Sequence, residues 1–283
     1  MRSTTPSKRV LTSGSAFRTP DPRRFTALRP CPRLKTARTH PRKRRPEFAM
    51  APASTWAEGP RDIVAVLAKS PHPGRVKTRM CPPLDPHQAA ELYGAMLADV
   101  LAATESFAVE SGLDPVLCVD PPRAVSELAR QAPPSFRVVA QRGAGLAERM
   151  AWALDEARAT GAAKVLLRGS DNPALSRAIL DSALEALEEA DIVVSPDLDG
   201  GYGLIGMRGP WSAVFDHPMS RPSVLDETLE HAARLGLRVQ QLQGSFDLDR
   251  GSDLDRLVEA SERDELDFCQ HTVQWIHNYQ MDT

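Results

Sequence analysis

Hydrophobic and polar positions change their spacing repeatedly after residue 61. Short runs rich in Val, Ile and Leu alternate with longer Ala-, Leu- and Glu-rich segments whose apolar residues recur at helical spacing. The short runs predict strands at 62–68, 115–120, 136–141, 163–171, 191–197, 202–208 and 237–243. The longer segments predict helices at 85–107, 124–132, 146–160, 176–190, 223–236 and 252–268. This alternation is typical of βαβ units, so we expect a single α/β domain with a doubly wound, mostly parallel sheet and helices on both faces.

The segments that follow the predicted strands carry most of the candidate chemistry. In a doubly wound sheet, ligands bind in the crevice at the carboxyl ends of the strands. A cationic loop follows the first strand, Gly-flanked Arg142 follows a later one, and acidic loops at 170–175, 196–203 and 244–253 follow three more. These loops would meet at one edge. Cations that face carboxylates suit a polyphosphate bound together with a divalent metal ion.

The loop after the first strand, "AKSPHPGRVKTRMCP", concentrates positive charge. It holds Lys69, Arg75, Lys77 and Arg79 together with Gly74. Phosphate oxygens need several donors, and a glycine lets backbone N–H groups approach them closely. The loop has neither the P-loop spacing nor the G-x-G-x-x-G pattern. A solvated basic loop explains the same residues equally well, so the loop alone leaves both interpretations open.

The acidic loops supply candidate metal ligands. Asp171 ends a hydrophobic strand, where a carboxylate can hold Mg²⁺ or Mn²⁺ or can cap the helix that follows. Asp247 and Asp249 alternate at the end of another predicted strand, so in an extended segment they face the same way. That arrangement suits one of them completing a metal site.

Two glycine-containing segments are ambiguous when each is taken alone. Gly200–Gly201 after Asp199 lets the backbone pass close to a ligand, or forms a plain hairpin turn. Arg142 and Arg149 flank a Gly-Ala-Gly segment, and Arg149 could simply pair with Asp155. No Ser–His–acid or Cys–His set is recognisable, so the sequence indicates no covalent nucleophile.

Residues 1–49 differ in composition from the rest of the chain. They hold 14 of the 35 Lys and Arg residues and only two of the 37 acidic residues, without periodic apolar positions. Such a segment cannot bury enough surface to fold. A disordered tail, a transit peptide, a nucleic-acid-binding arm and an over-extended reading frame with Met50 as the true start all fit, and we favour a segment without a role in function. The expected division is therefore an extension over 1–49 and a domain over 50–283.

The cysteines, the histidines and the length of the apolar stretches bear on the cellular compartment, on membrane association and on metal binding. The cysteines form no C-x-x-C pair and no secretory signal is recognisable, which predicts a reduced, cytoplasmic protein. No apolar stretch approaches the roughly 18 residues that span a bilayer, so we expect no membrane partner. The seven histidines show no metal-ligand spacing.

Taken in order, the motifs of the chain resemble the bacterial DUF2064 transferases of the GT-A (nucleotide-diphospho-sugar transferase) superfamily. That family includes glycosyltransferases linked to arsenosugar biosynthesis, and the chain is also similar to the phospholactate guanylyltransferases of coenzyme F420 synthesis. The likeness extends over roughly residues 62–257. Its motifs are "AKSPHPGRVKTRM", "AAELYGAMLADVL", "QRGAGLAERM", "RGSDNPAL", "DGGYGLIGM" and "FDLDRGSDL".

The resemblance implies a GT-A fold, a nucleotide at the first loop, and Mg²⁺ or Mn²⁺ held by Asp171 with Asp249. It places Lys77, Arg79 and Asp171 in catalysis, with the two cations stabilising the leaving group. The implied nucleotide-binding residues are Ala68, Lys69, Gly74, Arg75, Arg142 and Gly145. The implied acceptor-binding residues are Asp199, Gly200, Gly201 and Tyr202.

The chain departs from the family pattern at four points. Arg250–Gly251 follows Asp249 where the family continues D-x-D-T-P, and Gly203 stands where an aromatic residue is usual. Asn172 replaces a Cys or Ser, and Ala147 replaces a Gly. The first two departures lie where the resemblance places the acceptor. The identity of the acceptor is therefore the part of the function that the sequence defines least.

These residues predict a metal-dependent transferase that moves a nucleotidyl group from an NTP to a small phosphate- or carboxylate-bearing acceptor and releases pyrophosphate. Four cations in the first loop suit a triphosphate. Glycosyl transfer from a nucleotide-diphospho-sugar and a non-catalytic nucleotide-binding module are the alternatives. The expected partners are a nucleotide or nucleotide-sugar donor and a small-molecule acceptor; nucleic acid is not favoured, and a homodimer is left open.

Overall fold

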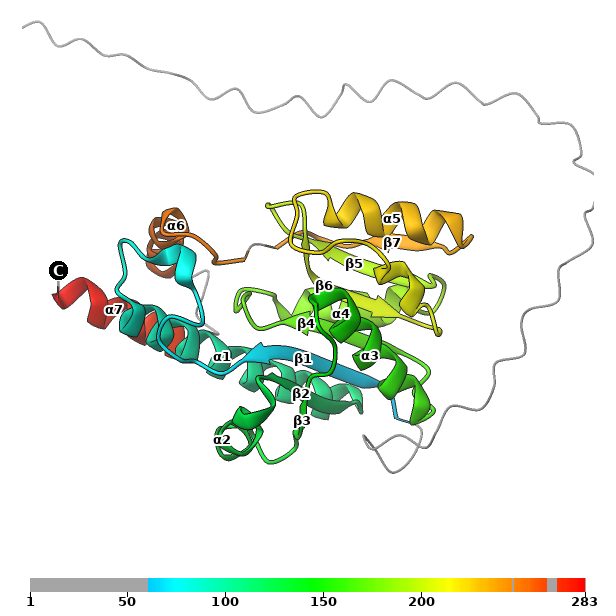
Figure 1. Cartoon of the computed structure of the whole chain (residues 1–283), viewed down its shortest axis with the longest axis horizontal. Helices are drawn as coiled ribbons and strands as arrows, with labels where there is room; N and C mark the ends of the chain where they lie inside the picture. Colours follow the sequence, from blue (N-terminus) through cyan, green and yellow to red (C-terminus); the bar gives the residue numbers. More distant parts are fainter. Residues whose placement is uncertain (1–60, 246, 264–268, 283) are drawn as a thin grey trace, which may run out of the picture. The chain divides into compact units, whose positions relative to one another are not determined.

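A seven-stranded sheet forms the centre of the fold (Figure 1). The computed structural model describes residues 61–245, 247–263 and 269–282, so the predictions for residues 1–49 lie outside it. The strands are β1 (Ile63–Lys69), β2 (Asp114–Asp120), β3 (Arg137–Ala140), β4 (Val165–Gly169), β5 (Ile192–Pro196), β6 (Tyr202–Met207) and β7 (Val239–Gln241). The helices are α1 (Pro86–Ser111), α2 (Val125–Gln131), α3 (Leu146–Ala159), α4 (Arg177–Ala186), α5 (Val224–Arg234), α6 (Ser252–Glu262) and α7 (Gln270–Asp282), with short 3₁₀ turns η1 (Thr78–Met80), η2 (Pro122–Ala124) and η3 (Ser212–Phe215).

The strand order is β3-β2-β1-β4-β6-β5-β7. Strand β1 pairs in parallel with β2 and β4, β2 with β3, and β5 with β7. Strand β6 alone among these runs antiparallel, to both β4 and β5. The predicted α/β class with a mostly parallel sheet is therefore confirmed, and the carboxyl ends of β1 and β4 lie next to each other.

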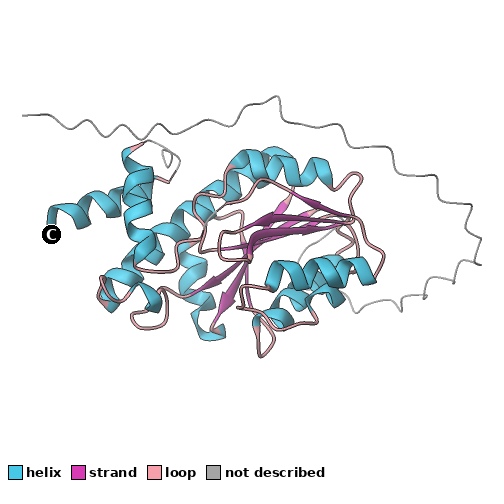
Figure 2. Cartoon of the chain, turned by 90° about the horizontal axis from the view of Figure 1, so that it is seen from above, coloured by secondary structure: helices cyan, strands magenta, loops and turns pink. Residues whose placement is uncertain are grey.

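Helices cover both faces of the sheet, as Figure 2 shows. The sequence of strand β1 explains why. Its side chains alternate between the faces because successive residues of a strand point in opposite directions. Ile63 and Ala65 are buried in a cluster with α3, η3 and α5 residues. Val64 and Val66 are buried in clusters that contain α1 and α4 residues. A strand buried on both faces needs the continuous apolar run seen in the sequence.

Helix α1 begins at a capping box. The Asp85 side chain accepts from the backbone N–H groups of His87 and Gln88, and Gln88 Oε1 accepts from Asp85 N at 2.9 Å. The helix ends at Gly112, whose φ of 72° lies in the left-handed region that glycine adopts freely.

Contrary to the expectation from the sequence, α1 has the length and mean hydropathy of a membrane-spanning segment. Most of its apolar window is buried, because it packs against β1, β2, α4 and α7. Core packing accounts for its apolar character.

The C-terminal segment is a correction to the predicted elements. The predicted helix 252–268 ends at Glu262, and residues 264–268 lie outside the described part. Beyond them, α7 forms where the sequence suggested no element. Its buried side chains join a cluster with residues of the β1–α1 loop, α1 and α6, including Met80, Leu92, Leu254 and Ile276. In Figure 1 the cyan loop after β1 accordingly lies beside α6.

A distant carboxylate supplies the N-terminal cap of α7. Asp99 is buried within α1, and its Oδ1 accepts from His271 N at 3.0 Å while its Oδ2 accepts from Thr272 N at 2.8 Å. Oδ1 also lies 2.8 Å from His271 Nδ1. The cap is contributed from 172 residues away in the sequence, so no local signal marks the start of α7.

We expect Asp99→Ala to detach α7 from α1. The substitution leaves two backbone donors without their acceptor, which should lower the free energy of unfolding by about 1–3 kcal/mol. Urea denaturation measures the change. Glu91→Ala, at an exposed position of the same helix, is the matched control. Equal stability of the two variants would contradict the capping role.

Candidate active site

A cleft of about 740 Å³ opens at the carboxyl ends of β1 and β4. Its lining brings together the cationic loop after β1 and carboxylates from three later loops, as the sequence predicts. Of the predicted site residues, the cleft is lined by Ala68, Lys69, Arg75, Lys77, Arg79, Gly145, Asp171, Asp199, Gly201, Tyr202 and Asp249. Gly74, Arg142 and Gly200 are not part of its lining, and Arg142 lies over the ring of Trp152 instead.

Lys77 lies between the two predicted metal ligands. Its side chain is 2% exposed, and Nζ is 2.5 Å from Asp171 Oδ1 and 3.5 Å from Asp249 Oδ1. Arg79 Nη1 contacts the other oxygen of Asp249 at 3.5 Å. The backbone of Lys77 has φ 48°, a left-handed conformation that is unusual for a residue with a side chain. A strained backbone therefore holds the ammonium group between the two carboxylates.

Two further carboxylates crowd the same place. Burial, then the charges of Asp197 and Asp171, raise the pKa of Asp247 to about 8. Burial is also the main cause that raises the pKa of Asp197 to about 6, although hydrogen bonds from Ser245 and Asn172 oppose it. Burial and neighbouring negative charge therefore disfavour the ionised form of both carboxyl groups unless positive charge is added nearby.

Asp197 is a member of the cleft that the sequence analysis did not select. It lies in the loop that begins at the end of β5, two residues before the predicted Asp199, and its pattern D-L-D-G-G is also that of an ordinary turn. Asp197 Oδ1 accepts from Ser245 Oγ at 3.0 Å and from Asn172 Nδ2 at 3.4 Å.

Asp247 and Asp249 both line the cleft, but not for the reason that the sequence suggested. Strand β7 ends at Gln241, so the two aspartates do not alternate along a strand. Leu248 between them is buried in the cluster shared with α6 and α7, and its N–H donates to Asp171 O at 3.3 Å. This anchor turns its two neighbours toward the cleft.

The carboxylates match a hard divalent cation in donor chemistry. Mg²⁺ and Mn²⁺ prefer oxygen ligands, and a cation would offset the crowding that raises the pKa of Asp247. Among the described residues, however, no three His, Cys, Asp or Glu side chains are positioned as a metal site. The Lys77 ammonium supplies positive charge between Asp171 and Asp249 in this arrangement.

Tyr93 joins the two central strand ends behind the cleft. Its hydroxyl accepts from Lys69 N at 2.9 Å and lies 2.7 Å from Ser170 Oγ, so it links the residue that ends β1 to the residue that precedes Asp171. Burial, then the nearby charge of Asp171, raise the pKa of Tyr93. Tyr93 lies within the helix predicted over 85–107, and the sequence gave no signal of this link.

Arg168 supports the Asp171 loop from within the core. Its guanidinium is buried and donates to Asn172 O and to Thr104 Oγ1, each at 3.1 Å. Burial lowers the pKa of Arg168 to about 10. A charged side chain in a hydrophobic strand thus fixes the backbone of the loop that carries Asp171.

Two departures from the family pattern are structurally linked. A Cβ atom at position 203 would lie 2.9 Å from Asn172 Nδ2 and 3.3 Å from Asp197 Oδ2. Gly203 therefore leaves the space in which Asn172 contacts Asp197. The predicted acceptor side is in this way partly filled by a polar contact between β4 and β5 loops.

The other predicted acceptor residues have partners within the protein. Gly200 has φ 87°, and a Cβ atom there would lie 2.0 Å from Pro222 O, so its glycine permits the close approach of two loops. The Tyr202 hydroxyl accepts a hydrogen bond from Thr228 Oγ1 on α5 at 3.5 Å. Burial raises the pKa of Tyr202 to about 12.

The β3 end of the cleft presents Gln141 in a fixed orientation. Its Nε2 donates to Cys118 O at 2.8 Å and to Ala68 O at 3.1 Å. Carbonyl oxygens only accept, so these contacts determine which end of the amide is the NH₂ group. These two contacts leave Oε1 as the unused end of the amide, on a residue that lines the cleft.

Arg149 also lines the cleft, and the sequence suggested that it could pair with Asp155. Among the ion pairs of the described residues, it pairs with Asp120 instead. The distance to Asp120 Oδ2 is 2.8 Å, and Arg149 Nε donates to Gly143 O at 3.2 Å. These contacts tie the start of α3 to the end of β2.

The sheet order and the cleft at the carboxyl edge of the sheet are those of a GT-A-like fold, and the comparisons with known proteins define the class as a transferase. The model of the family described as "Uncharacterized protein conserved in bacteria (DUF2064)" matches residues 103–221, which confirms the family resemblance.

The individual proteins to which the chain is similar are also described as transferases. The phosphoenolpyruvate guanylyltransferase of Sphaerobacter thermophilus is 29% identical over 186 residues, which cover 64% of this chain and 86% of the relative. The crystal structure of a candidate nucleotide-diphospho-sugar transferase from Desulfovibrio desulfuricans G20 is 28% identical, with a TM-score of 0.64 over 78% of this chain and 98% of that one. A nucleotidyl transferase from Methanothermobacter shares the fold at 18% identity, with a TM-score of 0.51 over 72% and 99% of the chains. The predicted fold and enzyme class, a transferase, are confirmed.

Asp247→Asn should stabilise the protein when divalent metal ions are removed with EDTA. The pKa of Asp247 is raised to about 8, above the unfolded value of about 4, so the folded state binds the extra proton between these values. Stability then falls as pH rises through that window, and the amide removes this loss. We expect the variant's gain in Tm over wild type to be larger at about pH 9 than at about pH 5.

The matched control for this prediction is Asp216→Asn, at an exposed position outside the cleft lining. A gain in Tm that is the same at both pH values, or that the control shares, would show that Asp247 is not crowded by its neighbours.

Proposed function

We propose that this protein is a nucleotidyltransferase that moves a nucleoside monophosphate group from an NTP to a small anionic acceptor. The observation that carries the proposal is the position of Lys77 between Asp171 and Asp249, in a cleft that Arg75 and Arg79 also line. The guanylyltransferase from Sphaerobacter thermophilus supports the reaction type and favours GTP as the donor.

In the proposed reaction, an oxygen of the acceptor's phosphate or carboxylate attacks the α-phosphorus of the donor. A new P–O bond forms there, and the bond to the bridging oxygen breaks to release pyrophosphate. The attacking oxygen is already an anion, so no covalent nucleophile or strong general base is required. The cleft needs only to align the reactants and neutralise their charge.

Lys77 and Arg79 are the groups proposed to neutralise the leaving pyrophosphate. Asp171 and Asp249, with Asp247 behind them, are the residues that would hold a divalent metal ion. Such an ion would supply further charge neutralisation at the phosphates. Lys69 and Arg75 extend the positive rim along the same loop, where the rest of the triphosphate would lie.

Gln141 supports guanine as the base. With its NH₂ group bound to the carbonyls of Ala68 and Cys118, it offers an acceptor to the cleft. Guanine carries two neighbouring N–H donors on one edge, at N1 and at the exocyclic amine, whereas adenine presents an acceptor at N1. A fixed acceptor at this position would therefore favour guanine.

A coupled assay for pyrophosphate tests the proposal. The full chain is incubated with each of the four NTPs, Mg²⁺ or Mn²⁺, and phosphoenolpyruvate as the first acceptor, followed by other small phosphorylated acids. We expect pyrophosphate release that depends on acceptor, with GTP preferred. Release of nucleoside diphosphate from nucleotide sugars, without pyrophosphate from any NTP, would overturn it.

Glycosyl transfer is the second candidate function. The Desulfovibrio desulfuricans structure favours it, because that protein is described as a candidate nucleotide-diphospho-sugar transferase. In this version, the same cations and carboxylates would hold the leaving nucleoside diphosphate. The released product separates the two candidates, since glycosyl transfer yields no pyrophosphate.

Asp171→Asn should abolish turnover while the protein stays folded. The substitution keeps the size of the side chain but removes a carboxylate charge next to Lys77, so we expect kcat/KM to fall by about a hundredfold or more. Circular dichroism checks the fold, and Asp255→Asn on the exposed side of α6 is the matched control. Turnover within threefold of wild type would refute the assignment.

Gln141→Leu should reduce the preference for GTP. Loss of the fixed acceptor should lower the ratio of kcat/KM for GTP over ATP by about tenfold. Because the ratio compares two donors on one enzyme, a general disturbance of the loop cancels. Gln131→Leu, an exposed glutamine on α2, is the control, and an unchanged ratio in Gln141→Leu would exclude base selection by this residue.

A further inference from the structure

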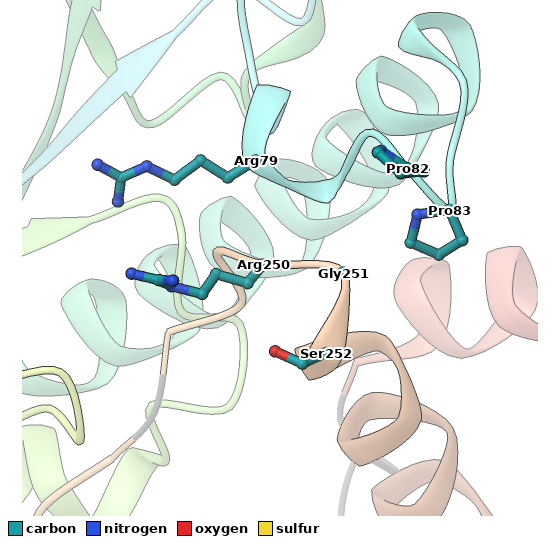
Figure 3. Close-up of a pocket in the computed structure, with 6 residues that line it drawn as sticks. All are labelled: Arg79, Pro82, Pro83, Arg250, Gly251 and Ser252. Carbon is teal, nitrogen blue, oxygen red and sulfur yellow. The ribbon is translucent and has the colours of Figure 1, made fainter.

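Arg79 and Arg250 form an arginine pair at the outer rim of the cleft. Both residues line the cleft itself, and both line a second, shallow hollow beside it. Figure 3 shows the two side chains running alongside each other with their guanidinium groups pointing the same way. The remaining walls of the hollow are Pro82, Pro83, Gly251 and Ser252.

Backbone hydrogen bonds hold Arg250 beside Arg79. Gly251 N donates to Arg79 O at 3.3 Å, and a Cβ atom on Gly251 would lie 2.7 Å from Pro82 O, so only glycine permits this approach. On the other side, Asp253 Oδ2 accepts from Asp249 N at 2.9 Å and from Arg250 N at 2.8 Å. Two segments 170 residues apart are thereby fixed against each other.

The charge of the arginine pair is incompletely balanced within the protein. Arg79 shares Asp249 with Lys77, each at 3.5 Å. Within residues 61–245, 247–263 and 269–282, the Arg250 guanidinium forms no ion pair and no hydrogen bond. Two adjacent cations repel each other unless an anion lies between them, so the pair favours a ligand that brings at least two negative charges.

Phosphate is the anion that this geometry suits best. A guanidinium presents its N–H donors as a planar fork that matches two phosphate oxygens, and two such forks can grip one phosphate from adjacent sides. Arg250 also stands where the D-x-D-T-P pattern of the similar family has Thr, so this second arginine is an addition to that pattern.

We propose that Arg79 and Arg250 clamp a phosphate dianion at the rim of the cleft, an inference that rests on the proposed function. The phosphate has two sources in that reaction: the terminal phosphate of the nucleotide donor, or the phosphate of the acceptor. In both cases, Arg250 contributes to recognition of the substrate beyond the Lys77 and Asp171 cluster.

Isothermal titration with pyrophosphate tests the clamp directly, at fixed ionic strength because screening weakens surface charge interactions. Arg250→Ala should raise the Kd for pyrophosphate by about tenfold or more. Arg250→Lys, which keeps the charge but loses the fork, should fall between that variant and wild type. Arg234→Ala removes an exposed arginine at the far end of α5 and should leave the Kd unchanged.

Further titrations of Arg250→Ala identify the source of the phosphate. Weaker binding of GTP with unchanged binding of GMP assigns the clamp to the donor's terminal phosphate. Unchanged binding of GTP, with weaker binding of inorganic phosphate to the GMP-saturated protein, assigns it to the acceptor. Both outcomes support the proposal.

Kd values for pyrophosphate, GTP and inorganic phosphate within twofold of wild type in Arg250→Ala would overturn the clamp. An equal loss in Arg234→Ala would also overturn it, because the effect would then be one of net charge. Failure of the proposed function is a separate result: wild type would bind pyrophosphate through Arg250 yet release none from any NTP.

Discussion

The crowding of carboxylates around one buried ammonium group is the constraint on which the site depends. Asp171, Asp197, Asp247 and Asp249 come from three loops that follow different strands, and their mutual repulsion opposes the approach of those loops. Lys77 offsets part of this repulsion by contacting two of them. Its left-handed backbone is a conformation that costs about 1–3 kcal/mol, which the surrounding contacts must outweigh.

The supports behind the cleft explain how the loops stay together despite that repulsion. The Tyr93 hydroxyl joins the ends of β1 and β4, and Arg168 holds the backbone that follows Asp171. Leu248, buried against α6 and α7, fixes the last loop. Polar contacts that are themselves buried hold their partners in one geometry, because every alternative leaves a donor or acceptor without a partner.

The sequence predicts those features that are encoded by residues close together along the chain. Alternating apolar runs identify β1 to β7, and the position of Lys77 and Asp171 in loops that follow such runs places them at one edge of the sheet. Non-local partners leave no such pattern. Asp197 resembles a turn residue, Tyr93 resembles an ordinary core position, and the start of α7 depends on Asp99 in another helix. Arg149 likewise pairs with Asp120 across the fold rather than with Asp155 on its own helix.

The balance of charge in the cleft also constrains how a ligand can bind. A nucleotide alone would bring phosphates toward Asp171 and Asp249, which repel them, and toward Lys77, whose ammonium group is already engaged. A divalent cation that binds these carboxylates would take over the neutralising role of Lys77 and leave Nζ available to the phosphates. A metal ion and a polyphosphate bound together would therefore complement both the acidic cluster and the cationic loop. Arg79 also contacts Asp249, at 3.5 Å, so the same exchange would leave Arg79 available to the phosphates beside Arg250.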